Sequence, residues 1–106
     1  MYARKVTMNL KPNSVSDFTR SLEKEVIPML RRQNGFQDEI TFVVPDGTSV
    51  LAISLWDKAE NAEAYNRGNY SDVVKILSKV VEGTPRVEHY EVANSTFHKI
   101  AATVPV

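Results

Sequence analysis

The chain has 106 residues, of which 42% are hydrophobic and 25% are charged, a composition that suits one globular domain and leaves too little length for two cores. Thirteen Lys and Arg residues balance thirteen Asp and Glu residues, so no long-range field attracts nucleic acid or an anionic membrane. The absence of cysteine excludes disulfides, thiol nucleophiles, iron–sulfur clusters and thiolate zinc sites. No apolar run approaches the ~20 residues of a membrane span, and we expect a cytoplasmic protein that binds neither nucleic acid nor membrane.

The first predicted element is a strand over residues 2–10. Two sets of residues alternate there, one mostly apolar and one mostly polar, with the period of two that is typical of a strand. The mostly apolar set is Tyr2, Arg4, Val6, Met8 and Leu10, and the mostly polar set is Ala3, Lys5, Thr7 and Asn9.

A helix is predicted to follow and to end at Asn34-Gly35. Ser14 and Asp17 have the spacing of a capping box, in which the serine accepts a hydrogen bond from a free N–H and the carboxylate reaches back. Pro28 lies inside the helix, and because proline removes a hydrogen bond and clashes one turn back, we expect a kink or break near residues 24–26. The apolar stripe of this helix is Val15, Phe18, Leu22, Val26, Met29 and Leu30.

A hairpin is predicted next. Its first strand begins at Phe36 and carries Ile40, Phe42 and Val44 on one parity, and the turn is Pro45-Asp46-Gly47-Thr48. The second strand, residues 49–56, is apolar on both parities, which is typical of a strand that is covered on both faces. These residues are Leu51, Ile53 and Leu55 on one parity and Val50, Ala52 and Trp56 on the other.

Two short helices and a strand complete the predicted order. Asp57 and Glu60 resemble a second capping box, and the helix that they open stops at Gly68. The stripe of the next helix is Val73, Val74, Ile76, Leu77, Val80 and Val81. We expect Gly83-Thr84-Pro85 to end that helix and residues 87–93 to form the last strand.

This order predicts an α+β fold, a ferredoxin-like βαββαβ arrangement with a four-stranded antiparallel sheet and all helices on one face. It gives a single domain over residues 1–106, with its core at about residues 2–93. The uncovered face would expose an apolar patch of several hundred Å², so we expect a homodimer through the sheets. Residues 94–106, a C-terminal extension with Phe97, Ile100, Val104 and Val106, are expected either to lie across the partner subunit or to fray.

Two stretches resemble the antibiotic biosynthesis monooxygenase family. One runs from Lys11 to Phe36 and has a mid-helix proline before a Gly-Phe turn, and the other is Ser54-Leu55-Trp56-Asp57-Lys58-Ala59-Glu60, a strand that ends in Trp before a charged helix. The resemblance covers about residues 2–93. It implies a dimeric α/β barrel in which two ferredoxin-like sheets pack face to face, with a pocket between sheet and helices in each subunit. The superfamily includes cofactor-free oxygenases of polycyclic phenols, quinol oxygenases, haem-degrading enzymes and proteins without demonstrated activity, so the fold alone does not select a reaction.

Several chemistries fit the sequence poorly. The haem-degrading pattern fails, because its Trp position falls near Tyr65, no histidine occurs between Asp57 and Glu88, and Asn9 lies on the opposite parity from Val6 and Met8. His89 and His98 are the only histidines, whereas a first-row metal site usually requires three or more ligands. The four glycines are isolated and none opens a helix after a strand, which excludes a dinucleotide fingerprint and leaves a weakly bound flavin open.

We therefore expect a cofactor-independent monooxygenase that oxidises a small aromatic or quinol substrate, with no metal and no resident cofactor. Oxygen reacts directly with an electron-rich phenolate or enolate, so the protein needs a base or hydrogen-bond donors for the anion and an apolar pocket for the ring. His89 is the catalytic candidate, because it is the one residue of a predicted strand that titrates near neutral pH; otherwise it is an ordinary strand histidine. The substrate-binding candidates are Trp56, Tyr65, Asn66, Arg67 and Tyr70.

Each binding candidate also has a structural explanation. Trp56 is more often a core residue that closes the end of a sheet, Tyr65 an amphipathic helix residue, and residues 66–69 a polar turn. The competing hypothesis is therefore a non-catalytic module that binds a small ligand or dimerises. An oxygenase predicts an open apolar pocket with a polar group, whereas the module predicts that Phe18, Trp56 and Tyr65 fill the space. Stabilisation by planar phenols would distinguish the two.

Overall fold

Four antiparallel strands form one sheet, and every neighbouring pair is antiparallel. The computed structural model describes residues 1–97 of the chain. The strands are β1 (Tyr2–Leu10), β2 (Phe36–Val43), β3 (Ser49–Trp56) and β4 (Val81–Glu91). They lie in the order β2-β3-β1-β4, so β1 and β3 are central and β2 and β4 are edges. The predicted α+β, ferredoxin-like arrangement is confirmed.

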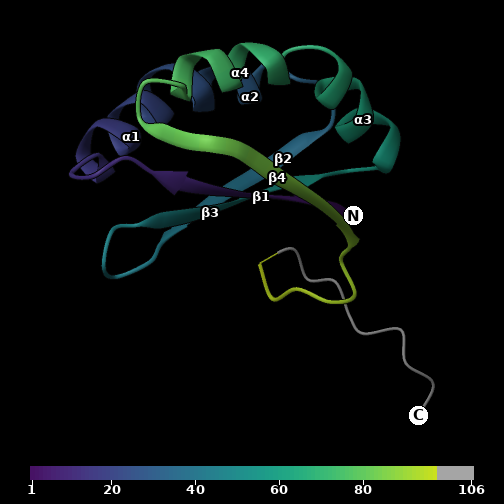
Figure 1. Cartoon of the computed structure of the whole chain (residues 1–106). Helices are drawn as coiled ribbons and strands as arrows, with labels where there is room; N and C mark the ends of the chain where they lie inside the picture. Colours follow the sequence, from purple (N-terminus) through teal and green to yellow (C-terminus); the bar gives the residue numbers. More distant parts are fainter. Residues whose placement is uncertain (98–106) are drawn as a thin grey trace.

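The helices cover one face of this sheet (Figure 1). Between β1 and β2 lie α1 (Val15–Ser21), the π-helical segment η1 (Leu22–Val26) and α2 (Ile27–Arg31); between β3 and β4 lie α3 (Ala59–Arg67) and α4 (Tyr70–Leu77). The buried apolar core between the two layers consists of Val6, Met8, Leu10, Phe18, Leu22, Val26, Leu30, Val50, Trp56, Ala62, Tyr65, Val73, Leu77 and Val80. No helix among residues 1–97 is long and apolar enough to cross a membrane.

The irregularity predicted from Pro28 is confirmed. The segment η1, Leu22–Val26, is π-helical and immediately precedes the helix that contains Pro28. Proline has no N–H to donate and its ring clashes with the preceding turn, so the α-helical hydrogen-bond ladder cannot pass through it. The chain forms a wider π turn there, and the next helix, α2, follows directly.

Neither predicted capping box forms. Ser14 has φ −107° and ψ 0° and makes no side-chain cap to α1, because these angles are not those of an extended N-cap residue. Asp17 accepts a hydrogen bond from Arg20 instead (3.1 Å). Asp57 accepts one from the side-chain amide of Asn61 (2.7 Å). In both cases a side chain within one turn donates a hydrogen bond to the carboxylate that was expected to take part in the cap.

The predicted start of the last strand is wrong. α4 ends at Leu77, and β4 begins at Val81 rather than at residue 87. Gly83 and Pro85 lie within β4, where its register with β1 shifts at a bulge, and Gly83 has a φ of +72° that glycine adopts without strain. Because β4 is an edge strand, the N–H that Pro85 lacks is tolerated.

The second face of the sheet has no helix over it in the described part of the chain (Figure 1). On β3, Val50 and Trp56 are buried beneath the helices, whereas Leu51 and Leu55 lie on the opposite parity and are half-buried. We name this second surface the open face. Phe97 is 82% exposed, and the rest of the apolar tail that was expected to cross to a partner, Ile100, Val104 and Val106, lies outside the described residues.

Candidate functional site

A cavity of about 130 Å³ lies between the helices and the sheet. Its walls are mostly apolar and come from both layers. The apolar side chains of the helices are Leu22, Val26, Leu30, Val73, Val74 and Leu77, and those of β1 and β3 include Val6, Met8 and Ala52. Phe18 and Trp56 are fully buried but do not line this space. Of the three residues expected to fill the space in a non-catalytic module, Phe18 and Trp56 therefore stay outside it, and Tyr65 forms part of its wall.

Arg4 is the charged residue of the cavity wall with the strongest structural constraints. Its side chain is almost wholly buried, with 2% exposed. Its Nη2 donates a hydrogen bond to Asn66 Oδ1 (2.7 Å), and its guanidinium carbon lies 3.9 Å from the ring centre of Tyr70 and 5.2 Å from that of Tyr65. Cation–π contacts of this kind stabilise a desolvated arginine. One face and one edge of the guanidinium are thus occupied within the chain.

The Nε of Arg4 is different, because it is buried and has no hydrogen-bond partner among residues 1–97. A buried donor without a partner costs about 1–3 kcal/mol, so native proteins rarely leave one without a reason. Burial lowers the pKa of Arg4, and the two neighbouring tyrosines oppose that shift. An arginine nevertheless stays protonated in proteins. Arg4 is therefore a permanent cation in the cavity wall, and its buried Nε has no partner in the described part of the chain.

Arg4 belongs to a row of four polar residues that crosses the sheet on its helix-covered face. Arg4 pairs with Ser54 of β3 on one side and with His89 of β4 on the other, and Ser54 pairs with Glu39 of β2. Residues opposite one another on neighbouring strands have Cβ atoms about 5 Å apart. Arg4, Ser54 and Glu39 line the cavity, whereas His89 does not.

Glu39 is the second ionisable group of this row in the cavity. Burial raises the pKa of its carboxyl, and a hydrogen bond from the hydroxyl of Thr41 opposes the shift in part. A carboxylate with a raised pKa is a stronger base than an exposed one. Glu39 and Arg4 are separated by one strand, with Ser54 between them. The cavity thus offers a proton acceptor and a cation on the same floor.

Stacked aromatic rings close the cavity at the α3 end. Trp56 and Tyr65 stack with ring centres 5.2 Å apart, and Tyr65 and Tyr70 lie 6.0 Å apart. The indole N–H of Trp56 donates to Ser54 Oγ (2.9 Å). Burial is the main reason that the pKa of Tyr65 rises to about 12. Trp56 therefore supports the wall from behind, and the two tyrosines form it.

The cavity reaches the surface beside the bulge of β4. Ser78 and Gly83 are exposed and also line it. A Cβ placed on Gly83 would meet no atom within 4 Å, so the space beside this residue is unobstructed. A small ligand could enter between the end of α4 and β4.

The predicted site residues do not all come together. Tyr65 and Tyr70 line the cavity, and Asn66 anchors Arg4 from its outer side. Arg67 is exposed and does not line the cavity. His89 is exposed on the edge strand, with its ring 5.7 Å from that of Tyr2. His98, the other histidine, lies outside the described residues.

Arg4 and Glu39 were not among the residues singled out from the sequence. Arg4 carried a usable signal, since it is a charged residue on the otherwise apolar parity of β1. Glu39 carried none, because it lies on the polar parity of β2 and only the sheet register brings it to the helix-covered face. In the described part of the chain, no three His, Asp or Glu side chains come close enough to hold a metal ion.

Comparison with known proteins identifies the fold. No family model matches the chain, and no curated protein matches it in sequence. Solved structures do match it. A monooxygenase of Streptomyces coelicolor, ActVA-Orf6, solved with nanaomycin D, has a TM-score of 0.72 at 19% identity over 89% of this chain and 88% of its own.

Two further structures show the range of proteins with this fold. SnoaB of Streptomyces nogalater, described as a cofactor-independent oxygenase, has a TM-score of 0.72 at 13% identity over 90% of this chain and 95% of its own. A protein of unknown function from Nitrosomonas europaea has a TM-score of 0.67 at 16% identity over 99% of this chain and 94% of its own. The resemblance inferred from the sequence is therefore confirmed as a shared fold with antibiotic biosynthesis monooxygenases, at identities that carry the fold and no activity.

Proposed function

We propose that this protein is a monooxygenase that oxidises a small aromatic hydroxy compound with molecular oxygen and without a resident cofactor. The observation that carries the proposal is Arg4, a buried cation in the wall of a mostly apolar cavity. An apolar cavity with few, well-placed polar groups is the usual form of a small-molecule site. The described oxygenase activity of structural neighbours supports the same assignment.

The reaction follows from the charges of the cavity. Glu39 accepts the proton of the substrate hydroxyl, and Arg4 stabilises the resulting oxyanion. The electron-rich anion then gives electrons to oxygen in a site from which most water is excluded. For a phenol the products are a para-quinone and water: one oxygen atom becomes the new carbonyl, and the other leaves with the ring hydrogen and the hydroxyl hydrogen.

The test is oxygen uptake by purified protein with a panel of phenols, naphthols, hydroquinones and anthrones. We expect protein-dependent uptake with at least one class of compound. Replacement Arg4→Met should lower the rate by about 10²–10³-fold, the usual cost of removing one oxyanion donor. Arg20→Met is the matched control, because Arg20 is exposed on α1 and pairs only with Asp17 among its described contacts.

Arg4→Met should still fold. Methionine is a flexible apolar residue of comparable length, and apolar replacements of buried charges are often neutral or stabilising. Asn66, which loses its partner, is exposed and can bind water. Absence of uptake across the panel would favour the alternative, a binding module. Loss of uptake in His89→Ala but not in Arg4→Met would return the catalytic role to His89.

We also propose that the protein is a homodimer through the open face. On β2, the apolar residues Ile40 and Phe42 lie on the open face, where they pair with β3 and are 43% and 51% exposed. These apolar side chains of an edge strand point away from the protein's own helices, so we expect a second apolar surface to cover them. Leu51 and Leu55 of β3 continue this patch across the open face.

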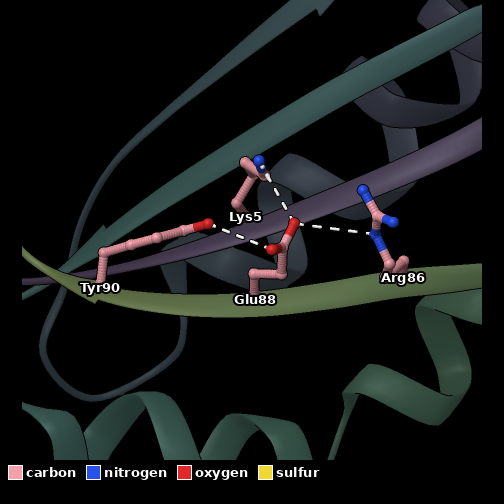
Figure 2. A network of polar contacts seen from close by, with 4 residues as sticks. All are labelled: Lys5, Arg86, Glu88 and Tyr90. Carbon is pink, nitrogen blue, oxygen red and sulfur yellow. Dashed lines mark hydrogen bonds and ion pairs between the residues drawn. The ribbon is translucent and has the colours of Figure 1, made fainter.

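The remaining part of the open face is polar, with two cations around one carboxylate. Glu88 pairs with Lys5 (3.3 Å) and Arg86 (3.7 Å), and accepts a hydrogen bond from the hydroxyl of Tyr90 (3.2 Å), as Figure 2 shows. The contact with Lys5 is the main reason that the pKa of Glu88 is lowered. The cluster therefore presents no unpaired carboxylate to a second copy, and it keeps one net positive charge.

Light scattering tests the dimer. We expect a particle of twice the chain mass of 11.9 kDa for the native protein and a monomer for Leu51→Asp, which places a charge in the apolar patch of the open face. The matched control is Thr19→Asp, because Thr19 is exposed on α1. A monomeric native protein would contradict the proposal, and circular dichroism of the variants separates dissociation from unfolding.

A further inference from the structure

The volume of the cavity limits the ligand that it can hold. In another protein, an engineered apolar cavity of about 150 Å³ holds one benzene molecule. The cavity described above measures about 130 Å³, so it has room for one aromatic ring and a small substituent. The fused rings of a naphthol or an anthrone exceed this volume and would extend into the opening beside Gly83. Its apolar walls, formed by η1, α4 and the floor of the sheet, suit the faces of such a ring.

The groups in the cavity wall also limit the charge of the ligand. The titratable residues that line it are Arg4, Glu39, Tyr65 and Tyr70. Arg4 is the one permanent cation among them, with Nη2 bonded to Asn66 and one face of the guanidinium on Tyr70. The guanidinium carries five N–H donors in all, so it keeps donors for an oxygen atom of a ligand. A charged acceptor makes the stronger hydrogen bond.

We infer that the ligand is a phenol of one ring, bound as the phenolate with its oxygen at the Arg4 guanidinium and its ring against the apolar wall. The inference rests on the proposed function for the location of the site, but it does not require that the protein converts the ligand. The ring occupies the space between Val26, Val73 and Ala52, and the oxygen lies at the row of polar residues. Leu22 and Leu77 are buried leucines of the cavity wall, so shortening either side chain would enlarge the space.

The first arm of the test uses 4-nitrophenol under anaerobic conditions, because its phenolate is coloured and the phenol is not. We expect binding to lower the apparent pKa of 4-nitrophenol by at least about one unit, which is a tenfold preference for the anion. Arg4→Met should abolish this shift, and Arg4→Lys should keep part of it through the remaining charge. An unchanged shift in the folded Arg4→Met protein would overturn the role of Arg4.

The second arm compares ring number at constant chemistry. Phenol, 1-naphthol and 2-anthrol each carry a phenolic hydroxyl, and hydrophobic transfer alone would favour the largest of them. We expect the order to be reversed, with phenol bound at least tenfold more tightly than 2-anthrol by anaerobic calorimetry. Equal or tighter binding of 2-anthrol would overturn the one-ring limit. Leu77→Ala, which enlarges the cavity, should improve binding of 1-naphthol, and failure to do so would also contradict the size argument.

The two arms are independent of oxygen chemistry. If 4-nitrophenol binds as the anion and no compound supports oxygen uptake, the inference stands and the proposed monooxygenase function fails. If uptake occurs only with three-ring substrates, the proposed function stands and the inference fails.

Discussion

Tyr65 offers a quantitative test of the cavity wall. Its pKa is raised from 10.0 to about 12, first because burial disfavours the tyrosinate and then because Tyr70 lies nearby, while Arg4 opposes the shift. In the unfolded chain Tyr65 loses its proton near pH 10, but in the folded chain it keeps the proton to about pH 12. The unfolded state therefore binds fewer protons in this window, and the free energy of unfolding falls as the pH rises. Two units correspond to about 2.7 kcal/mol.

The assay is urea denaturation below pH 10 and near pH 12, with Tyr65→Phe as the reference. Phenylalanine keeps the ring that stacks on Trp56 but cannot ionise. Lysines and the other tyrosines titrate in both proteins, so their contributions cancel in the difference. We expect the native protein to lose about 2.7 kcal/mol more than Tyr65→Phe across this range. Equal losses in the two proteins would refute the claim that the Tyr65 hydroxyl is buried at the cavity.

Three further predictions follow from single positions. Gly35 has a φ of +79°, and a Cβ there would collide with side chains that follow β3, so Gly35→Ala should lower the free energy of unfolding by about 2 kcal/mol or more in urea denaturation. Gly83→Ala, which has open space around it, should lower it by only about 1 kcal/mol. Equal costs for the two variants would contradict the close approach at Gly35. Trp56→Ala should destabilise the fold by about 3–5 kcal/mol, and a cost below about 1 kcal/mol would contradict its role in the core. Once a substrate is found, its rate of oxygen uptake should rise as the pH rises through the raised pKa of Glu39, because the base must be ionised. Glu39→Gln should remove this dependence on pH and lower the rate about 10²-fold or more. A pH profile that is unchanged in the variant would exclude Glu39 as the base.

The sequence predicted the fold because its elements have strong periodicity. The alternation in β1 and the doubly apolar β3 depend only on local order, and Pro28 acts through the backbone of its own helix. The start of β4 was missed because Gly83 and Pro85 normally end elements, and their acceptance depends on β4 being an edge. The capping boxes failed because side chains competed for the carboxylates, which a spacing rule does not include.

The site was less predictable, because it is assembled from distant residues. Tyr65, Asn66 and Tyr70 could be singled out as aromatic and polar residues after a strand. Their common partner is Arg4, which lies 62 positions from Asn66 in the chain. Glu39 reaches the cavity through the register of β2 with β3, which no single strand specifies. The single-domain organisation and the cytoplasmic location stay predictions.

The central claim is that one atom of molecular oxygen enters an aromatic product in a reaction that Arg4 supports. The most direct measurement is the mass of the product formed under oxygen-18 gas by the native protein and by Arg4→Met, with the substrate that gives the highest uptake. The account predicts one labelled oxygen atom per product molecule, and product formation that falls by about 10²–10³-fold in the variant. Product without label, accompanied by hydrogen peroxide, or equal labelled product from both proteins, would contradict it.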